Sequence, residues 1–321
     1  MGGKAAQPTG AQPRRQSEAG AEDWGRYLAL NTSFADPFIF RLTRRGFFSE
    51  VNVLLDAIIF GLLTRRRLLV TAFKFNGLRW NDYFGSALPE AGQAVWDQVG
   101  PDSFISDKND PFEALRRWTD QRRGKILDIP ELGLRGDQMA VRRWLLRRLC
   151  RPSSEVAAET DALMAEHALV DGGFSAIHVR RGDKVQQRIK GSRAWSEGVD
   201  VPIARYVDLI RSLGPGTPDV FVLTDDHAAV DELADPRHGF RVVALCPSDS
   251  RGHDQPSFNL QTAEDRRAII RRLVIETGIA ARSGFFAGGY QSNVARYVAT
   301  VHADPGRCVS VDAQKTPWEN Y

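Results

Sequence analysis

The stretch Phe174-Ser-Ala-Ile-His178-Val-Arg180-Arg181-Gly182-Asp183-Lys184 decides how this chain is interpreted. Its first six residues are typical of a short buried strand, and the next five place two guanidiniums, a carboxylate and an ammonium where that strand ends. In open α/β sheets, ligands bind outside the carboxyl ends of the strands. A guanidinium at that edge can hold a phosphate through two parallel hydrogen bonds. The stretch therefore predicts a site for a phosphorylated ligand.

The second half of the chain alternates between strand and helix patterns around this stretch. After the strand at 174–179, further strands are expected at 220–223, 240–245, 284–288 and 308–311. Helices are expected between them, at 203–213, 228–234, 262–282 and 291–302, with a polar loop at 247–261. This order is typical of a parallel, doubly wound sheet.

The first half of the chain contains one comparable unit. Residues 38–42 and 67–73 have strand patterns, and 43–49 forms a loop before the apolar helix expected at 50–64. Such a unit makes two parallel strands joined by a crossover helix. Later helices are expected at 111–123, 136–148 and 153–167.

The expected fold class is therefore α/β, with two Rossmann-like domains whose parallel sheets face a central cleft. We expect a disordered tail over 1–23, an N-terminal domain over 24–152 and a C-terminal domain over 153–321.

Composition narrows the class of protein further. The 321 residues are 42% hydrophobic, and 43 Lys+Arg against 40 Asp+Glu leave a net charge of +3, too small to predict nucleic-acid binding. Cys150, Cys246 and Cys308 are far apart and lack the spacing of a zinc site. The first 22 residues lack the apolar segment of a secretory signal, and the apolar stretch 51–63 is too short to span a bilayer. We expect a cytoplasmic protein.

Two acidic residues, Asp225 and Asp226, follow the expected strand at 220–223. They could bind a metal, act as a general base or cap the next helix. The chain contains no Asp-x-Asp motif, the arrangement common in metal-dependent sugar-nucleotide enzymes, so no metal is expected.

Two polar, glycine-containing segments precede helices and could bind an anion. Residues 284–296 contain Gln291, Ser292 and Asn293 at a helix start, where backbone N–H groups are exposed. Gly46, Ser49 and Asn52 occupy a similar place after the first strand. Tight packing corners are the alternative interpretation of the first segment. The aromatic stretch 75–84 is typical either of a sugar site or of a small hydrophobic cluster.

At His178, Arg180, Arg181 and Asp183 the chain resembles the inverting GDP-fucose fucosyltransferases, which carry a strand-end His-x-Arg-Arg-x-Asp motif. The Asp-Lys ending is most similar to the α-1,6-fucosyltransferases that act on Nod factors and on the N-glycan core. Similar patterns recur at Thr224-Asp-Asp and at Ser292-Asn-x-x-Arg296, and the resemblance covers roughly residues 38–312.

The resemblance implies a GT-B arrangement with the nucleotide sugar on the C-terminal domain and the acceptor on the N-terminal one. It implies that Arg180 contacts the pyrophosphate, His178 the guanosine and Glu276 the guanine. It also involves Asp225 in the nucleotide site and places the glycine loop at Gly46 opposite the β-phosphate.

The same resemblance implies metal-independent transfer of L-fucose, with inversion, from GDP-β-L-fucose to a glycan, oligosaccharide or glycolipid hydroxyl, in α-1,6 linkage. GDP-fucose is a substrate, and no cofactor is expected. Arg180 and Lys184 would stabilise the leaving diphosphate, with Asp183 holding these cations. Arg188 occupies the position of the family's glutamate, so Glu197 and Asp183 remain candidates for the general base.

Three other interpretations stay open. One is an α-1,2- or protein O-fucosyltransferase with the same motif, and another is a non-catalytic protein that binds nucleotide sugars or glycans. The third concerns the arginine-rich helix at 142–151, which is a solvated basic face or a peripheral contact with a membrane or glycolipid.

Overall fold

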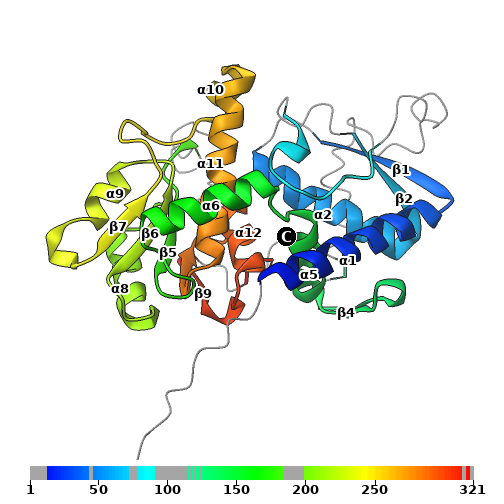
Figure 1. Ribbon diagram of the computed structural model, residues 1–321, viewed down its shortest axis with the longest axis horizontal. Coiled ribbons are helices and arrows are strands. Elements are labelled where there is room, and N and C mark those ends of the chain that lie inside the picture. The colour runs from blue at the N-terminus through cyan, green and yellow to red at the C-terminus, as the bar shows by residue number, and fades with distance from the viewer. Residues whose placement is uncertain are drawn as a thin grey trace, which may run out of the picture.

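The structure of the protein is a computed structural model, which describes residues 13–42, 46–71, 78–90, 115, 118, 121, 122, 124–183, 199–312 and 316–318. These residues form two lobes that lie side by side, with helices α11 (Ala263–Ala281) and α12 (Asn293–Val301) between them (Figure 1). The fold is mixed α/β and its main sheets are parallel, as the sequence predicts.

The C-terminal lobe is built on a five-stranded sheet in the order β7-β6-β5-β8-β9, in which every neighbouring pair is parallel. The strands are β5 (Ser175–Val179), β6 (Asp219–Thr224), β7 (Arg241–Ala244), β8 (Phe285–Gly288) and β9 (Cys308–Ser310). From the central β5 the chain moves outward through β6 to β7, then returns to place β8 on the other side. The point between β5 and β8 is therefore the topological switch point, where open α/β sheets bind ligands.

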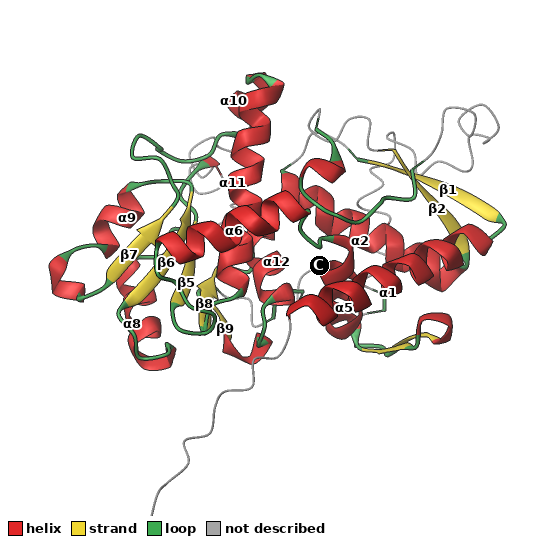
Figure 2. Ribbon diagram, in the orientation of Figure 1, coloured by secondary structure: helices red, strands yellow, loops and turns green. Residues whose placement is uncertain are grey.

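Helices cover both faces of this sheet (Figure 2). Ile177 and Val179 of β5 pack in the cluster that includes α8 (Ile203–Leu213) and Ala229 and Leu233 of α9 (Ala228–Leu233). Ala176 points to the opposite face, where it joins the larger cluster with α11 and α12. Alternate residues of one strand are buried on opposite faces, which explains its continuous apolar sequence.

The N-terminal lobe contains the parallel pair β1 (Asp36–Arg41) and β2 (Arg66–Thr71), joined by the crossover helix α2 (Phe47–Thr64). Around them lie α1 (Pro13–Ser33), the 3-10 helix η1 (Trp80–Asp82), the hairpin β3 (Leu127–Ile129) and β4 (Leu134–Gly136), and α5 (Gln138–Leu149). Helix α6 (Ser154–Glu166) follows and packs against α11. Helix α2 is long and apolar enough to cross a membrane, but 78% of it is buried within the protein, as expected of a core helix.

Three expectations differ from the structure. Residues 13–23, predicted to be part of the tail, form the first half of α1, whose buried side chains include Trp24 and Tyr27. Ser49, predicted to be in a loop, lies in the first turn of α2. The polar loop at 247–261 contains a short helix, α10 (Gln255–Leu260).

The prediction that the arginines of α5 form a solvated basic face is wrong for Arg142, whereas Arg147 is exposed. Arg142 is fully buried, forms an ion pair with Asp56 of α2, and lies 4.2 Å from the ring centroid of Trp318. Arg143 and Arg147 donate to the backbone oxygen of His302, at 2.6 and 2.8 Å. Cations at the carboxyl end of a helix are stabilised by its dipole, so these two arginines join the N-terminal lobe to the end of α12.

The start of α12 also contacts the N-terminal lobe. Asn52 Nδ2 of α2 donates to Asn293 Oδ1 at 2.9 Å, and the rings of Phe48 and Tyr297 lie 4.3 Å apart. Both ends of α12 are thus bonded to the opposite lobe, which fixes the two sheets relative to one another.

Candidate active site

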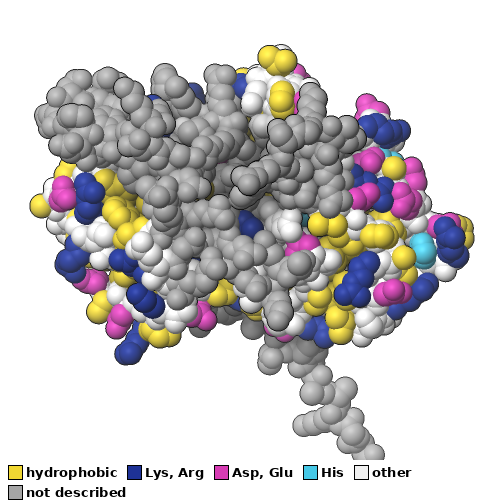
Figure 3. All heavy atoms as spheres, turned by 180° about the vertical axis from the view of Figure 1, so that it is seen from behind, with side chains coloured by type: hydrophobic (Ala, Val, Ile, Leu, Met, Phe, Trp, Pro, Cys, Tyr) yellow, Lys and Arg dark blue, Asp and Glu magenta, His cyan; other side chains and the backbone are white. Residues whose placement is uncertain are grey.

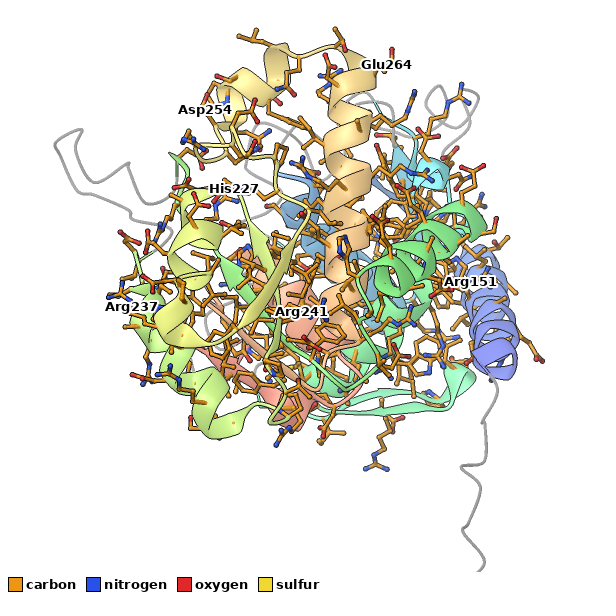
Figure 4. All side chains as sticks on the ribbon, turned by 60° about the vertical axis from the view of Figure 1, so that its left-hand side comes forward. Arg151, His227, Arg237, Arg241, Asp254 and Glu264 are labelled. Atoms are coloured by element: carbon orange, nitrogen blue, oxygen red, sulfur yellow. The ribbon has the colours of Figure 1, made fainter. Side chains whose placement is uncertain are left out.

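The residues of the strand-end motif lie at the switch point of the C-terminal sheet. His178 of β5 is in register with Gly288 of β8, and Val179 is in register with Thr224 of β6. The loops that follow these three strands therefore meet at one edge. Figure 4 shows Asp254, before α10, at this end of the lobe, whereas Arg237 and Arg241, which precede or begin β7, lie toward the other end.

Arg180 is the first residue beyond β5, and its guanidinium lies against two carboxylates. Nη2 donates to Asp183 Oδ1 at 2.9 Å, and Nε lies 3.8 Å from Asp225 Oδ2. The side chain is 24% exposed, and Nε has no hydrogen-bond partner among the described residues. The guanidinium is therefore positioned by carboxylates but keeps donors for an anionic ligand.

Arg181 points elsewhere. Its guanidinium forms a bidentate pair with Glu232 of α9, at 2.6 and 3.0 Å, and this partner raises its pKa. Of the two adjacent guanidiniums, that of Arg181 is paired with Glu232, whereas that of Arg180 faces the sheet edge.

Asp225 joins two loops through backbone hydrogen bonds. Its carboxylate accepts from the N–H groups of Arg181 at 2.9 Å, Gly182 at 3.1 Å and His253 at 3.1 Å. Asp226 instead accepts at 3.1 Å from the N–H of Ala228, the first residue of α9, although the N-cap residue of that helix is His227.

The two loops cross at a pair of glycines. A Cβ atom on Gly182 would lie 2.4 Å from the backbone oxygen of His253, which leaves no room for a side chain. Gly252 has φ +96°, and a Cβ there would lie 2.8 Å from Gly182 Cα. This contact requires glycine at both positions, because larger residues would separate the loops and displace Arg180.

Glu276 on α11 has a buried carboxylate, and the groups around it do little to balance its negative charge. The residue is 4% exposed, Oε1 has no hydrogen-bond partner among the described residues, and the nearest cation is Arg272 Nε at 3.9 Å. Burial raises the pKa of Glu276 to about 8. An orphaned buried acceptor is costly, so the geometry fits a ligand that supplies N–H donors.

Glu276 lies on α11, the helix that packs against β5 and β6. Cys246 follows the end of β7, and the pKa of its thiol is raised by burial and also by the carboxylates of Glu276 and Asp225. Both carboxylates therefore affect the pKa of this one thiol, one from α11 and the other from the loop beyond β6.

His178 is a neutral imidazole inside the strand. The residue is 7% exposed, and burial, together with the nearby Arg180 charge, lowers its pKa to about 4. Its backbone oxygen accepts a hydrogen bond from the Tyr206 hydroxyl at 3.1 Å. Near neutral pH this side chain can donate or accept a hydrogen bond but carries no charge.

Two helix N-termini without side-chain caps border the edge. Ser292 precedes α12 and Gly46 precedes α2, and neither end has a side-chain cap bond. Gln291 N–H is bonded to Asp312 Oδ2 at 2.8 Å. A Cβ atom on Gly46 would lie 3.6 Å from Gln255 Oε1, so the start of α2 adjoins the C-terminal lobe here.

Two predicted catalytic residues, Lys184 and Glu197, lie outside the described residues. Conversely, sequence reasoning overlooked His253 and Gln255, which the structure brings to the Arg180 loop. Asp254 caps α10 with Pro256 in its first turn, a known helix-start pattern that could have drawn attention to this segment.

No protein-family model matches the chain, and no curated protein matches it in sequence. Among solved structures, the fucosyltransferase NodZ from Bradyrhizobium is similar over 82% of this chain and 92% of its own, with 16% identity and a TM-score of 0.51. Arabidopsis thaliana FUT1, solved as a mutant in complex with GDP, is similar over 93% of this chain and 76% of its own, with 12% identity and a TM-score of 0.50. The fold is that of the GT-B-like fucosyltransferases.

A third structure, POFUT1 in complex with GDP-fucose, is 14% identical over 88% of this chain and 99% of its own, but its TM-score of 0.48 is too low to support an inference. The likeness to NodZ and FUT1 covers both lobes. The similarity of fold therefore extends over most of the chain.

Proposed function

We propose that this protein is a glycosyltransferase that moves L-fucose from GDP-β-L-fucose to a hydroxyl of a glycan acceptor. The observation that carries the proposal is the partly exposed guanidinium of Arg180 beyond the end of β5, and the buried carboxylate of Glu276, whose Oε1 has no hydrogen-bond partner among the described residues, supports it. The guanidinium suits a diphosphate, and the carboxylate suits the N–H groups of guanine. The fold shared with fucosyltransferases, one of them solved with GDP, supports the same donor.

In this proposal the guanine donates its N1–H and exocyclic amine to Glu276, which binds as the carboxylate. His178 contributes a neutral hydrogen-bonding group toward the guanosine. The diphosphate lies against Arg180 and the N-termini of α12 and α2, where backbone N–H groups and helix dipoles favour negative charge. Asn52 and Asn293, bonded to each other across the lobes, hold these two helix starts together.

The chemistry is a direct displacement with inversion. The acceptor oxygen bonds to the anomeric carbon, the bond from that carbon to the phosphate oxygen breaks, and its electron pair leaves with GDP. Arg180 stabilises the negative charge that develops on the diphosphate, and such preorganised electrostatic stabilisation often contributes more to an enzyme's rate than any other effect. Asp183 positions Arg180, and Lys184 would add a second cation beside it.

We propose that the reaction needs no metal ion. Asp225 accepts three backbone hydrogen bonds and Asp226 accepts one at the start of α9, so both carboxylates after β6 already have structural partners. Within the described ranges no group of at least three His, Cys, Asp or Glu residues could hold a metal.

The α-1,6 linkage is the form of transfer we propose first, because of the Asp183-Lys184 ending of the motif. The arginines Arg142, Arg143 and Arg147 have partners within the chain, so they do not favour a membrane contact. On the face drawn in Figure 3, basic and acidic side chains are intermixed over the described surface, which agrees with a small-molecule donor rather than a nucleic acid.

The proposal is tested by incubating the protein with GDP-fucose and a panel of glycans, measuring GDP release and analysing the product linkage. We expect acceptor-dependent GDP release that EDTA leaves unchanged. Binding of GDP-fucose without turnover on any acceptor would favour a non-catalytic nucleotide-sugar protein, an alternative raised by Arg188 at the position of the family's glutamate.

A further inference from the structure

His253 lies where the Arg180 loop meets the N-terminal lobe. Its backbone oxygen accepts from Asp183 N–H at 2.9 Å, and its own N–H donates to Asp225 Oδ2 at 3.1 Å. These two carboxylates are the ones that flank Arg180. The backbone of His253 is therefore held in a fixed relationship to the guanidinium proposed to bind the diphosphate.

The imidazole of His253 is oriented by Gln255. His253 Nε2 lies 3.4 Å from Gln255 Oε1, and Gln255 Nε2 donates to Asn259 Oδ1 at 3.1 Å. With the amide nitrogen of Gln255 assigned to the bond with Asn259, the amide oxygen faces the ring, and we assign the ring proton to Nε2 and the lone pair to Nδ1. The ring also packs against Phe258, with centroids 5.5 Å apart. An imidazole whose ring is oriented by a neighbouring side chain is the arrangement of a general base.

Gln255 connects the imidazole of His253 to the boundary between the lobes. Its backbone N–H donates to Asp183 Oδ2 at 3.3 Å, while the other oxygen of that carboxylate accepts from Arg180. Its Oε1 lies 3.6 Å from the position that a Cβ on Gly46 would take, at the start of α2. The segment thus runs from the donor side of the edge to the lobe expected to hold the acceptor.

The other groups at this boundary have different partners. Both oxygens of Asp183 accept hydrogen bonds, which makes this carboxylate a positioning group. His178 is buried in β5 and its pKa is about 4. The charged residues around His253 include Asp183 and Asp225, which bond its backbone, the adjacent Asp254, and Arg180, which Asp183 holds.

We propose that His253 is the general base of the transfer, an inference that rests on the proposed function. As the acceptor oxygen bonds to the anomeric carbon and the electron pair of the breaking bond leaves on GDP, the hydroxyl proton passes to Nδ1 of His253. Gln255 accepts the hydrogen bond from Nε2–H before and after this step, and so stabilises the imidazolium that forms.

The test compares His253→Asn and Gln255→Glu with the wild type, using kcat and kcat/KM for GDP-fucose across pH and the Kd for GDP. His253→Asn is expected to lower kcat about 100-fold or more, to abolish the acidic limb of the pH profile and to leave the GDP Kd unchanged. Gln255→Glu is expected to move that limb to higher pH, because a carboxylate beside Nε2 favours the protonated ring. A merely structural loop residue would not produce this shift.

His238→Asn is the matched control, since His238 lies in the same lobe beyond α9 and stacks on Phe240, 6.4 Å between centroids. It is expected to keep wild-type kinetics. If His253→Asn keeps kcat and the acidic limb, His253 is not the base and the proposed function stands. If the wild type neither binds GDP nor consumes GDP-fucose, the proposed function fails and the role of His253 fails with it.

Discussion

Asp225 accepts a hydrogen bond from Gly182 N–H at 3.1 Å, across the ends of two neighbouring strands. The same carboxylate bonds Arg181 and His253, so one side chain fixes both the loop that carries Arg180 and the loop that carries His253. The positions of the two proposed catalytic groups, Arg180 and His253, therefore depend on Asp225, whose carboxylate accepts hydrogen bonds from the backbone.

Asp225→Asn is predicted to lower both stability and activity. An amide group keeps one oxygen but turns an NH2 toward backbone donors, which leaves buried N–H groups unpaired at about 1–3 kcal/mol each. We expect a lower free energy of unfolding and a loss of turnover larger than the loss of GDP affinity. Asp231→Asn is the control, since its carboxylate is 77% exposed. Unchanged stability in Asp225→Asn would show that the loops do not depend on this carboxylate.

Arg180→Ala is predicted to lower transfer at least 100-fold while the protein stays folded, because the side chain is partly exposed and stabilises charge that develops on the leaving group. The measurements are kcat for GDP-fucose and the melting temperature. Arg237→Ala, at the opposite end of the lobe and 76% exposed, should change neither. Retention of most activity in Arg180→Ala would refute the assignment of the leaving-group site.

Glu276 is predicted to make stability depend on pH. Its folded pKa of about 8 lies above the ordinary value, so between about 4.5 and 8 the folded state binds more protons than the unfolded state. The contribution of Glu276 to the free energy of unfolding is therefore complete below pH 4.5. It is lost as the pH rises to 8, at no more than about 1.4 kcal/mol per pH unit. Glu276→Gln should therefore melt near the wild-type temperature at pH 5 and above it at pH 8. Parallel melting curves at both pH values would contradict the raised pKa.

Glu276 also predicts which nucleobase the protein prefers in a bound nucleotide. If Glu276 accepts from the exocyclic amine, the wild type should bind GDP more tightly than inosine diphosphate, which lacks that amine. Affinity for GDP should rise with pH until about 8, because the ligand needs the carboxylate. Glu276→Gln should lose both effects in calorimetric titrations. Equal affinity of the wild type for the two nucleotides would place the guanine elsewhere.

Arg142→Ala is predicted to destabilise the protein by about 3–5 kcal/mol, because it leaves the buried Asp56 carboxylate without this partner. Chemical denaturation measures the change. Arg135→Ala is the control, with a side chain that is 75% exposed, and should cost little. A small effect of Arg142→Ala would mean that water or another group replaces the guanidinium.

Local patterns in the sequence predicted the C-terminal lobe well. Helix α8 has the bounds expected at 203–213, and the helix expected at 262–282 is α11, whose N-cap Thr262 accepts from Asp265 N–H at 3.1 Å. Such features depend on residues close in the chain. Helix α10 was missed because six residues are too few for a helical period to show.

Contacts between distant residues could not be predicted. Arg142 pairs with Asp56, 86 positions away, and Arg143 with the backbone of His302, 159 positions away, so neither partner appears in a local window. In the site, the sequence predicted the cluster of charges at the end of β5. The partner that engages Arg181, Glu232, became apparent only from the packing of α9 beside the sheet.

A crystal structure of the protein with GDP would locate the nucleotide relative to Arg180 and Glu276. We predict the diphosphate within hydrogen-bonding distance of the Arg180 guanidinium, between β5 and β8, with the guanine donating to Glu276. A nucleotide bound away from this edge, or an Arg180 side chain that still bonds only Asp183 while GDP is present, would contradict the proposed donor site.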